Sequence, residues 1–320
     1  SLFSPHDVPG LYDAFGTDEF DELYIRYERD QSIPRKTVGA QELILDILKE
    51  RAETGRLYLM NIDHCNSHSS FKDKVNMSNL CQEITLPTDP INHIDDEAGE
   101  IALCILSAIN VGKVSKKEEL EEICDLAVRG LEELIDYQEY PVAAARRSTL
   151  SRRSLGIGYI GLAHYLAKHK VKYDSPEAWK LVHDLTEAFQ YYLLKTSNEI
   201  AKEKGACDGF QQTKYADGIL PIDTYKKEVD ELVPNDLEYD WESLRKSILE
   251  HGLRHSKDHL TRLFRNTTAL RVLTLFYGIC LVTLGTSMLL RSCKSSSTKQ
   301  SAVTGVTIQR TIPTTKSLSQ

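Results

Sequence analysis

The stretch Asn79-Leu80-Cys81-Gln82-Glu83-Ile84-Thr85 says most about the architecture and the chemistry of this chain. Asn79, Cys81 and Glu83 occupy alternate positions, and the segment is followed by Pro87, which predicts an extended conformation. Alternate side chains of an extended segment point to one side, so an amide, a thiol and a carboxylate would share a face. Such a trio suits chemistry on a polyhydroxylated molecule, with sulfur as radical or nucleophile and the carboxylate as proton acceptor.

The same three residues also have an ordinary interpretation. A cysteine between polar residues is commonly a half-buried thiol without chemistry, and Asn and Glu on a strand face are commonly solvated. The sequence on either side of the trio therefore has to decide between the two interpretations.

Length and charge bound the class of protein. The chain has 320 residues, enough for one large or two ordinary domains, and its 41% hydrophobic content is enough to fill a globular core. Residues 257–320 carry nine Lys or Arg and one acid, whereas residues 1–256 carry 30 basic and 46 acidic residues. An acidic body argues against general nucleic-acid binding, so we expect no nucleic-acid partner.

The cysteine content predicts a reducing compartment. The number of cysteines is odd and no C-x-x-C motif occurs, which does not resemble the cysteine pattern of a secreted disulfide scaffold. We therefore expect a cytoplasmic location. Cys124 and Cys207 lie on or beside predicted helices and are expected to be inert. No signal peptide opens the chain and no initiator Met is present, which predicts an internal piece of a longer polypeptide. The seven cysteines are Cys65, Cys81, Cys104, Cys124, Cys207, Cys280 and Cys293.

Apolar periodicity predicts a helix-rich α/β architecture, because helices alternate with short strand-like runs. A strand is predicted over residues 56–62 and a polar loop over residues 64–78, before the extended segment that carries the trio. The predicted helices span residues 18–30, 41–54, 116–137, 176–204 and 240–251.

The character of the chain changes after Ser256. Residues 272–290 are apolar and uncharged and are just long enough to span a bilayer, which makes this run a transmembrane candidate. Beyond Arg291 the sequence is rich in Ser and Thr and has little to pack.

Eight stretches, in order along residues 1–256, resemble the large (α) subunit of class I ribonucleotide reductase. They are LFSPHDVPGL (2–11), NIDHCN (61–66), SNLCQEI (78–84), GEIALC (99–104), RRSLGIG (152–158), YYLLK (191–195), GILPIDTY (218–225) and HGLR (251–254). The resemblance implies part of a ten-stranded α/β barrel with a finger loop that carries the radical cysteine. Residues 1–256 would then be the central and C-terminal part of the barrel domain, and residues 257–320 an unrelated, irregular tail.

The resemblance also assigns roles. Cys81 looks like the residue that becomes a thiyl radical and abstracts the 3′-hydrogen of the ribose. Glu83 looks like the base that takes the 3′-OH proton, and Asn79 like the amide that holds Glu83 and the substrate hydroxyls. Leu80 would line the ribose site. Cys104 looks like one of two cysteines that deliver reducing electrons and end as a disulfide.

The implied substrate is a ribonucleoside diphosphate, and no cofactor is expected in this chain. The radical would come from a separate metal-containing small (β) subunit, and electrons from a reductant of the thioredoxin or glutaredoxin type. ATP and dNTP effectors, with the second reducing cysteine, would belong to an upstream large-subunit fragment. The family's substrate-phosphate loop should follow soon after residues 251–256, where this chain reads Lys257-Asp258-His259-Leu260 instead.

The tail permits a further hypothesis. Residues 276–282 can be encoded by TTT TAT GGG ATA TGC CTG GTA. When this DNA is read one base earlier, it encodes Leu-Trp-Asp-Met-Pro-Gly. Codons that can be chosen for residues 293–302 also encode a different sequence when they are read with the same one-base shift. Both shifted strings resemble downstream segments of the family. Residues 257–320 would then be an out-of-frame translation after a deletion, so we do not expect a selected membrane anchor.

Several alternatives remain open at this point. Cys104 lies in an apolar stretch and could equally be a buried core thiol. His64, Cys65 and His68 suggest zinc but lack a second ligand pair, so no metal site is assigned. Gly156-Ile157-Gly158 fits close packing better than a phosphate loop. As a whole, the chain is either a reductase fragment that needs companion polypeptides or an inactive, degenerate fragment with a membrane-seeking tail.

Overall fold

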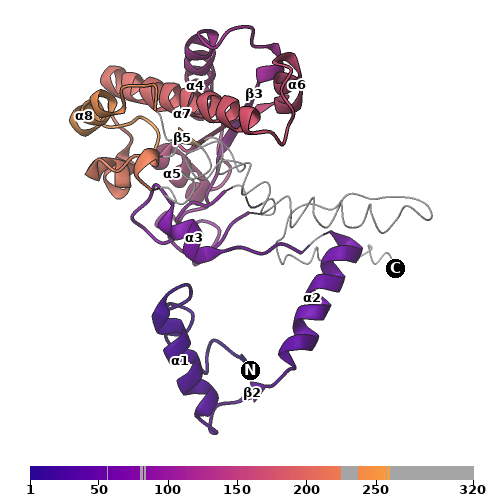
Figure 1. The fold of residues 1–320 in the computed structure, drawn as a ribbon. Coiled ribbons are helices and arrows are strands. Elements are labelled where there is room, and N and C mark those ends of the chain that lie inside the picture. The colour runs from indigo at the N-terminus through magenta and orange to yellow at the C-terminus, as the bar shows by residue number, and fades with distance from the viewer. Residues whose placement is uncertain (56, 80–81, 83, 225–236, 257, 260–320) are drawn as a thin grey trace, which may run out of the picture. The chain divides into compact units, whose positions relative to one another are not determined.

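The computed structural model of the chain describes residues 1–55, 57–79, 82, 84–224 and 237–256, together with the backbone of residues 258–259 (Figure 1). The chain divides into two compact units, which meet in sequence between Cys65 and Asn66.

The first unit, Ser1–Cys65, pairs a two-residue strand with two helices. Strand β1 (Leu2–Phe3) runs antiparallel to β2 (Arg35–Lys36), and helix α1 (Asp18–Arg29) lies between them in sequence. Helix α2 (Ala40–Thr54) ends at Gly55, whose left-handed φ of 64° is the conformation that favours glycine at a helix C-terminus. The helices predicted over residues 18–30 and 41–54 are confirmed.

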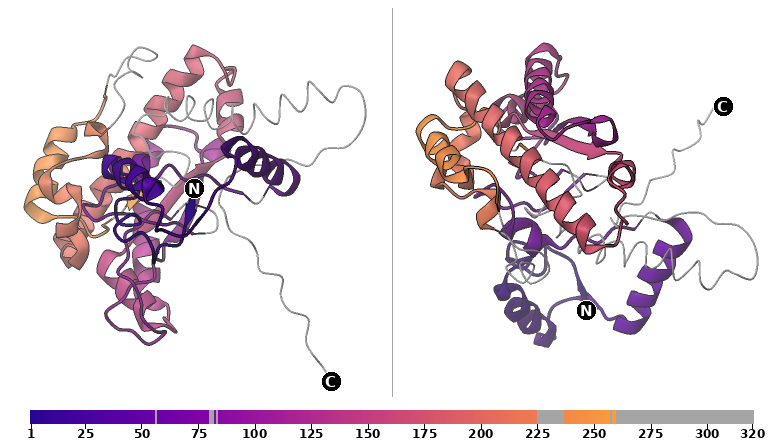
Figure 2. Two further views of the ribbon diagram at one scale, coloured as in Figure 1. Left: turned by 90° about the horizontal axis from the view of Figure 1, so that it is seen from below. Right: turned by 45° about the horizontal axis from the view of Figure 1, so that its top comes forward.

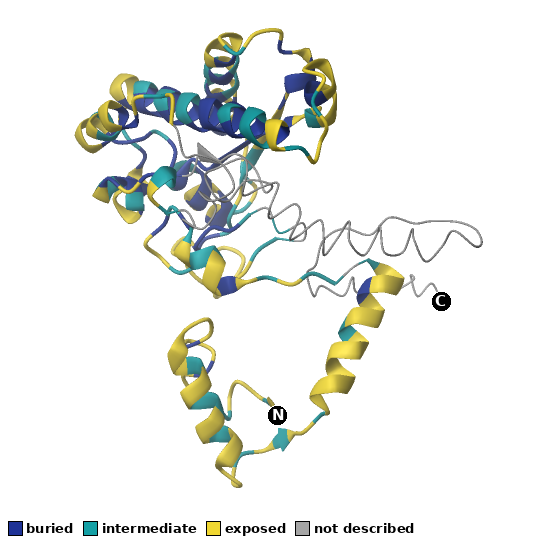
Figure 3. Ribbon diagram, in the orientation of Figure 1, coloured by how far each residue is buried: buried dark blue, intermediate teal, exposed yellow. Residues whose placement is uncertain are grey.

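The apolar stripe of α2 is exposed, since Leu43, Ile44 and Leu48 keep 40–55% of their surface accessible (Figure 3). Of the strand predicted over residues 56–62, the described residues 57–61 form only a single bridge residue, Tyr58, and Ile62 already belongs to helix α3 (Ile62–Ser67). The backbone N–H of Cys65 donates to the carbonyl of Asn61 at 2.9 Å, which starts a helical turn where an extended chain was expected.

The second unit is built on a parallel sheet in the order β3-β4-β5. Strand β3 (Ile105–Asn110) pairs along its whole length with β4 (Leu155–Ile160), and β4 pairs with β5 (Asp258–His259). Parallel neighbours need long crossovers, and helices supply them here. Helices α4 (Glu119–Tyr137) and α5 (Ala143–Arg152) connect β3 to β4; α6 (Leu162–Lys168), α7 (Pro176–Lys204) and α8 (Trp241–His251) lie between β4 and β5.

Helices α4 and α7 pack against each other beside the sheet (Figure 2). Ser175 begins α7 by accepting a hydrogen bond from the N–H of Ala178, Pro176 follows it, and the helix ends before Gly205, as residues 176–204 predict. The described residues of the unit also form four 3-10 turns: Val111–Lys113, Asp208–Gln212, Lys214–Asp217 and Pro221–Asp223. The main core combines buried residues of α4, β4 and α7: Leu120, Cys124, Val128, Leu155, Ile157, Phe189 and Leu193.

The chain is thus a helix-rich α/β protein, as predicted, in which the described sheet of the second unit has three parallel strands. Gly156 and Gly158 lie inside β4 rather than in a loop, which agrees with close packing and not with phosphate binding. The predicted transmembrane run, residues 272–290, lies outside the described residues.

Candidate functional site

The trio falls partly outside the described residues: Leu80, Cys81 and Glu83 are not described, whereas Asn79 is. The carbonyl of Asn79 accepts from the N–H of Gln82 at 3.0 Å, and Gln82 has a φ of 60°. An i to i+3 bond and a left-handed residue are incompatible with a strand, so the expectation of an extended segment is wrong at Asn79 and Gln82.

Side chains close the base of this turn, which we call the cysteine loop (residues 78–84). The Oδ1 atom of Asn79 accepts from the N–H of Ile84 at 3.0 Å, and the hydroxyl of Ser78 donates to the carbonyl of Ile84 at 2.6 Å. Asparagine stabilises turns in this way because its short side chain bonds to nearby backbone. Asn79 therefore holds the loop itself, a role that the sequence argument missed.

The chain before the loop, residues 66–77, forms an upstream arm that is fixed to the 3-10 region. The side-chain amide of Asn66 makes two hydrogen bonds to the backbone of Val75, at 2.7 and 3.0 Å. The N–H of Lys72 donates to Gln212 at 2.9 Å, and the N–H of Lys214 donates to Ser70 at 2.7 Å. These hydrogen bonds give this arm a defined path toward the loop.

The chain after the loop, residues 85–100, forms a downstream arm. Thr85, Leu86 and Pro87 are buried. The arm then closes on itself, since the N–H of Glu100 donates to the carbonyl of Asp89 at 2.9 Å and Oε2 of Glu100 accepts from the N–H of Asp89 at 3.2 Å.

Two residues shape the turn within the downstream arm. Hydrogen bonds from the backbone N–H groups of Asn92 and Ala98 lower the pKa of Asp96 to about 2, so this carboxylate stays charged. A Cβ on Gly99 would lie 2.3 Å from Cγ2 of Ile91 and 2.8 Å from the carbonyl of Pro90, which leaves room only for glycine.

Cys104 comes four residues after the downstream arm, immediately before β3. It is half-buried, and its sulfur lies 3.9 Å from the carbonyl of Ile105. The alternative of a fully buried core thiol is therefore not what is found at this position. Cys124 and Cys207 are buried, and burial raises the pKa of Cys207 to about 12, which makes it a poor nucleophile as predicted.

A buried ion pair joins the downstream arm to helix α5. The Nε and Nη2 atoms of Arg152 donate to the two carboxylate oxygens of Glu100, at 3.1 and 2.8 Å. Both residues fall within motifs quoted above, but nothing in a single sequence identifies two residues 52 positions apart as partners.

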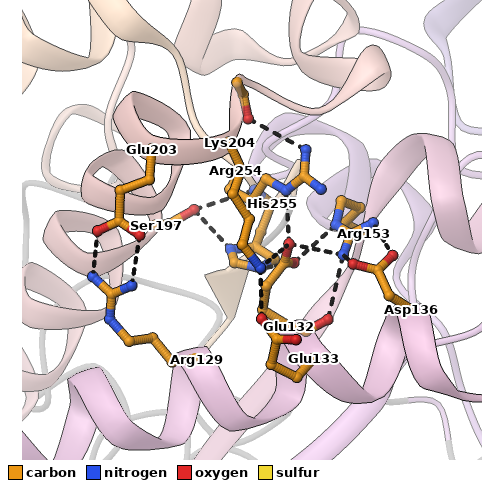
Figure 4. A network of polar contacts seen from close by, with 11 residues as sticks. Arg129, Glu132, Glu133, Asp136, Arg153, Ser197, Glu203, Lys204, Arg254 and His255 are labelled. Carbon is orange, nitrogen blue, oxygen red and sulfur yellow. Dashed lines mark hydrogen bonds and ion pairs between the residues drawn. The ribbon is translucent and has the colours of Figure 1, made fainter.

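A second buried network ties the chain entering β5 to helix α4 (Figure 4). Glu132 of α4 is 1% exposed and accepts from Arg153, Arg254 and His255, at 2.7–3.0 Å. Hydrogen bonds from these three residues outweigh burial and hold the pKa of Glu132 far below its ordinary value. Arg153 has a strained, left-handed φ of 47°, which this pairing and two bonds to Asp136 help to hold.

No metal site is assigned to His64, Cys65 and His68 from the sequence. His68 contacts the carbonyl of Thr224 through Nδ1 at 2.7 Å, and the part of the chain that the structure describes contains no group of three metal-ligating side chains. No helix in the described ranges is long and apolar enough to cross a membrane.

Comparison with known proteins places the chain. Residues 1–261 match the family model described as ribonucleotide reductase, barrel domain. The chain is 56% identical over 284 residues to the ribonucleoside-diphosphate reductase subunit alpha of Haemophilus influenzae, covering 87% of this chain and 37% of that protein. It is 54% identical over 261 residues to ribonucleoside-diphosphate reductase 1 subunit alpha of Escherichia coli, and 38% identical over 264 residues to the subunit alpha of phage T4. In both of these matches 80% of this chain aligns with 34% of the relative. The chain spans about a third of the length of these relatives, and it belongs to the ribonucleotide reductase barrel-domain family.

Proposed function

We propose that this chain is a catalytic part of a ribonucleoside-diphosphate reductase α subunit and takes part in reducing ribonucleotides to 2′-deoxyribonucleotides. One observation carries the proposal: the cysteine loop, with its intact N-x-C-x-E sequence, lies inside a match to the reductase barrel domain that covers residues 1–261. The half-buried Cys104 and the anchoring of both arms support the same function.

The chemistry assigned to the side chains is what the resemblance to the reductase family implies for them. A thiyl radical on Cys81 takes the 3′-hydrogen atom of the ribose, and Glu83 accepts the 3′-OH proton. The 2′-OH is then lost as water, and Asn79 and Leu80 line the ribose. Cys104 and a second cysteine supplied from upstream provide two electrons and two protons and end as a disulfide, after which the 3′-hydrogen returns from Cys81.

The proposal requires companions. An upstream α-subunit fragment would complete the ten-stranded barrel, in which strands β3 and β4 would be one part and the cysteine loop the finger. A small (β) subunit would supply the radical, a thioredoxin-type or glutaredoxin-type protein the electrons, and ATP or dNTPs the regulation through the upstream part. A cytoplasmic location suits the reactive thiols that the proposal assigns to Cys81 and Cys104.

Residues 1–256 form the reductase portion in this proposal, and residues 257–320 form a tail read out of frame. Determining the coding DNA tests the tail: a single-base offset after codon 256 should restore sequence that resembles the family. If no offset does so, the frame-shift hypothesis is wrong and the tail is a genuine segment.

Reconstitution tests the function. The purified chain is mixed with an upstream α fragment that carries the second cysteine, a small subunit and a dithiol reductant, and reduction of a ribonucleoside diphosphate is measured. We expect turnover only in the complete mixture. No turnover in any combination would favour the alternative of an inactive, degenerate fragment.

A further inference from the structure

Arg152 contacts chain segments on both sides of the cysteine loop. Its guanidinium holds Glu100 at the end of the downstream arm, and its Cζ lies 5.6 Å from the ring centre of Phe71 in the upstream arm. Its carbonyl accepts from the N–H of Ser256, just before β5, at 2.9 Å. One residue thus links both arms to the start of a strand.

The pair with Glu100 is buried, which makes it sensitive to substitution. Arg152 is 8% exposed and Glu100 is 6% exposed. A bidentate guanidinium–carboxylate pair fixes the relative orientation of the two side chains as well as their distance. Removing either side chain leaves the charge of the other buried without compensation. The pair therefore holds the downstream arm to helix α5 as long as both side chains are present.

The remaining nitrogen of Arg152 points to the upstream arm. Nη1 is buried and makes no hydrogen bond with any described residue, and its nearest carboxylate oxygen, Oδ2 of Asp73, is 4.0 Å away. A shift of about 1 Å would bring this contact within hydrogen-bond distance. Because a buried donor without an acceptor costs free energy, the geometry favours closure of the upstream arm onto Arg152.

We propose that Arg152 is a positioning residue for the cysteine loop. It fixes the two arms to each other, and through Glu100 it sets the loop relative to Cys104, which follows four residues later. The catalytic consequence of this role rests on the proposed function, whereas its effect on the loop's local stability does not.

Hydrogen exchange tests the local effect on the full chain. Arg152→Lys keeps the charge but loses the bidentate pair, and Asp73→Asn leaves the Glu100 pair intact. The matched control is Arg147→Lys, on the same helix but exposed, with a 3.4 Å contact to Asp89. The readouts are the amides of Gln82 and Ile84, which donate to Asn79, against the buried amides of α4.

We expect Arg152→Lys to speed exchange at Gln82 and Ile84 by about tenfold, which corresponds to about 1.4 kcal/mol. Asp73→Asn should speed it by less, while α4 and the Arg147→Lys control stay unchanged. Unchanged exchange at the loop in Arg152→Lys overturns the proposal. The proposal is also overturned if the exchange rates at the loop and in α4 increase equally in both Arg152→Lys and Asp73→Asn, because such a result marks general destabilisation.

Kinetics of the reconstituted enzyme supply the second readout. A misplaced loop should lower kcat by about a hundredfold while KM changes little, because positioning acts on the reacting geometry and not on substrate binding. Unchanged kcat in Arg152→Lys contradicts the catalytic part. If the wild-type mixture has no turnover, the proposed function fails, and the exchange experiment still decides the role of Arg152 on its own.

Discussion

The Oε2 atom of Glu132 lies 3.0 Å from Nε2 of His255, and both side chains are almost fully buried. Glu132 belongs to α4, and His255 lies three residues before β5. Nδ1 of His255 lies 2.9 Å from the hydroxyl of Ser197 in α7, so both imidazole nitrogens have a partner. These contacts fix where the chain enters the sheet.

Replacing Glu132 should destabilise the second unit strongly. Glu132→Gln leaves Arg153 and Arg254 without their carboxylate, and breaking such a buried pair costs about 3–5 kcal/mol. The matched control is Glu133→Gln, whose 71% exposed carboxylate pairs with Lys204 and which should change the free energy of unfolding by less than about 1 kcal/mol. Urea unfolding of both variants checks this; equal stabilities would contradict it.

Acid should destabilise the fold through the same pair. Burial lowers the pKa of His255 below its ordinary value of 6.5, and hydrogen bonds lower the pKa of Glu132 below 4.5. For both residues the unfolded chain binds the proton more tightly than the folded chain does. The free energy of unfolding is therefore highest above the ordinary pKa values of 6.5 and 4.5, and it decreases as pH falls from these values through the lowered pKa values of the folded chain. Tm should therefore decrease from about pH 6.5 downward. His255→Gln should flatten the curve between about pH 6.5 and 5, and an unaltered slope there would be the contrary result.

Two glycines should respond to alanine in opposite directions. Gly99→Ala forces contacts under 3 Å with Pro90 and Ile91 and should cost about 1–3 kcal/mol. Gly130→Ala, inside α4 with nothing within 4 Å of the new Cβ, should stabilise the chain by about 0.5–1 kcal/mol. Thermal unfolding of the two variants provides the comparison, and a neutral Gly99→Ala would show that the downstream arm adjusts freely.

Native thiols should label in an order set by burial. Iodoacetamide should modify the half-buried Cys65 and Cys104 in the folded chain, whereas Cys124 and Cys207 should react only after unfolding. For Cys207 the raised pKa of about 12 adds to the lack of access. Peptide mass spectrometry after a short pulse measures all four sites, and early labelling of Cys124 would contradict the packing of α4 described above.

Local signals explain which parts of the fold were predictable. Helices α1, α2, α4, α7 and α8 follow from apolar spacing and from end signals such as Pro176 and Gly205. Helix α5 was missed because its sequence, rich in Ala, Arg and Ser, carries no apolar period. It buries small residues such as Ala144 and Ser148 instead.

The site was predictable in residue type but not in geometry. The motif of the cysteine loop indicates the family, yet the turn at Asn79 depends on side-chain bonds to Ile84 that strand periodicity does not encode. The partners Glu100 and Arg152 are far apart in sequence, and Glu132 and His255 are further still. Pairings of this kind arise only when the helices and strands pack.

Activity of a Cys81→Ser variant tests the central claim most directly. The variant and a Cys65→Ser control are each reconstituted with the upstream fragment, the small subunit and reductant, and formation of the deoxyribonucleotide is measured. We expect turnover for the wild type and for Cys65→Ser, and none for Cys81→Ser, because serine does not supply a thiyl radical. Deoxyribonucleotide formation by Cys81→Ser at the wild-type rate would contradict the central claim.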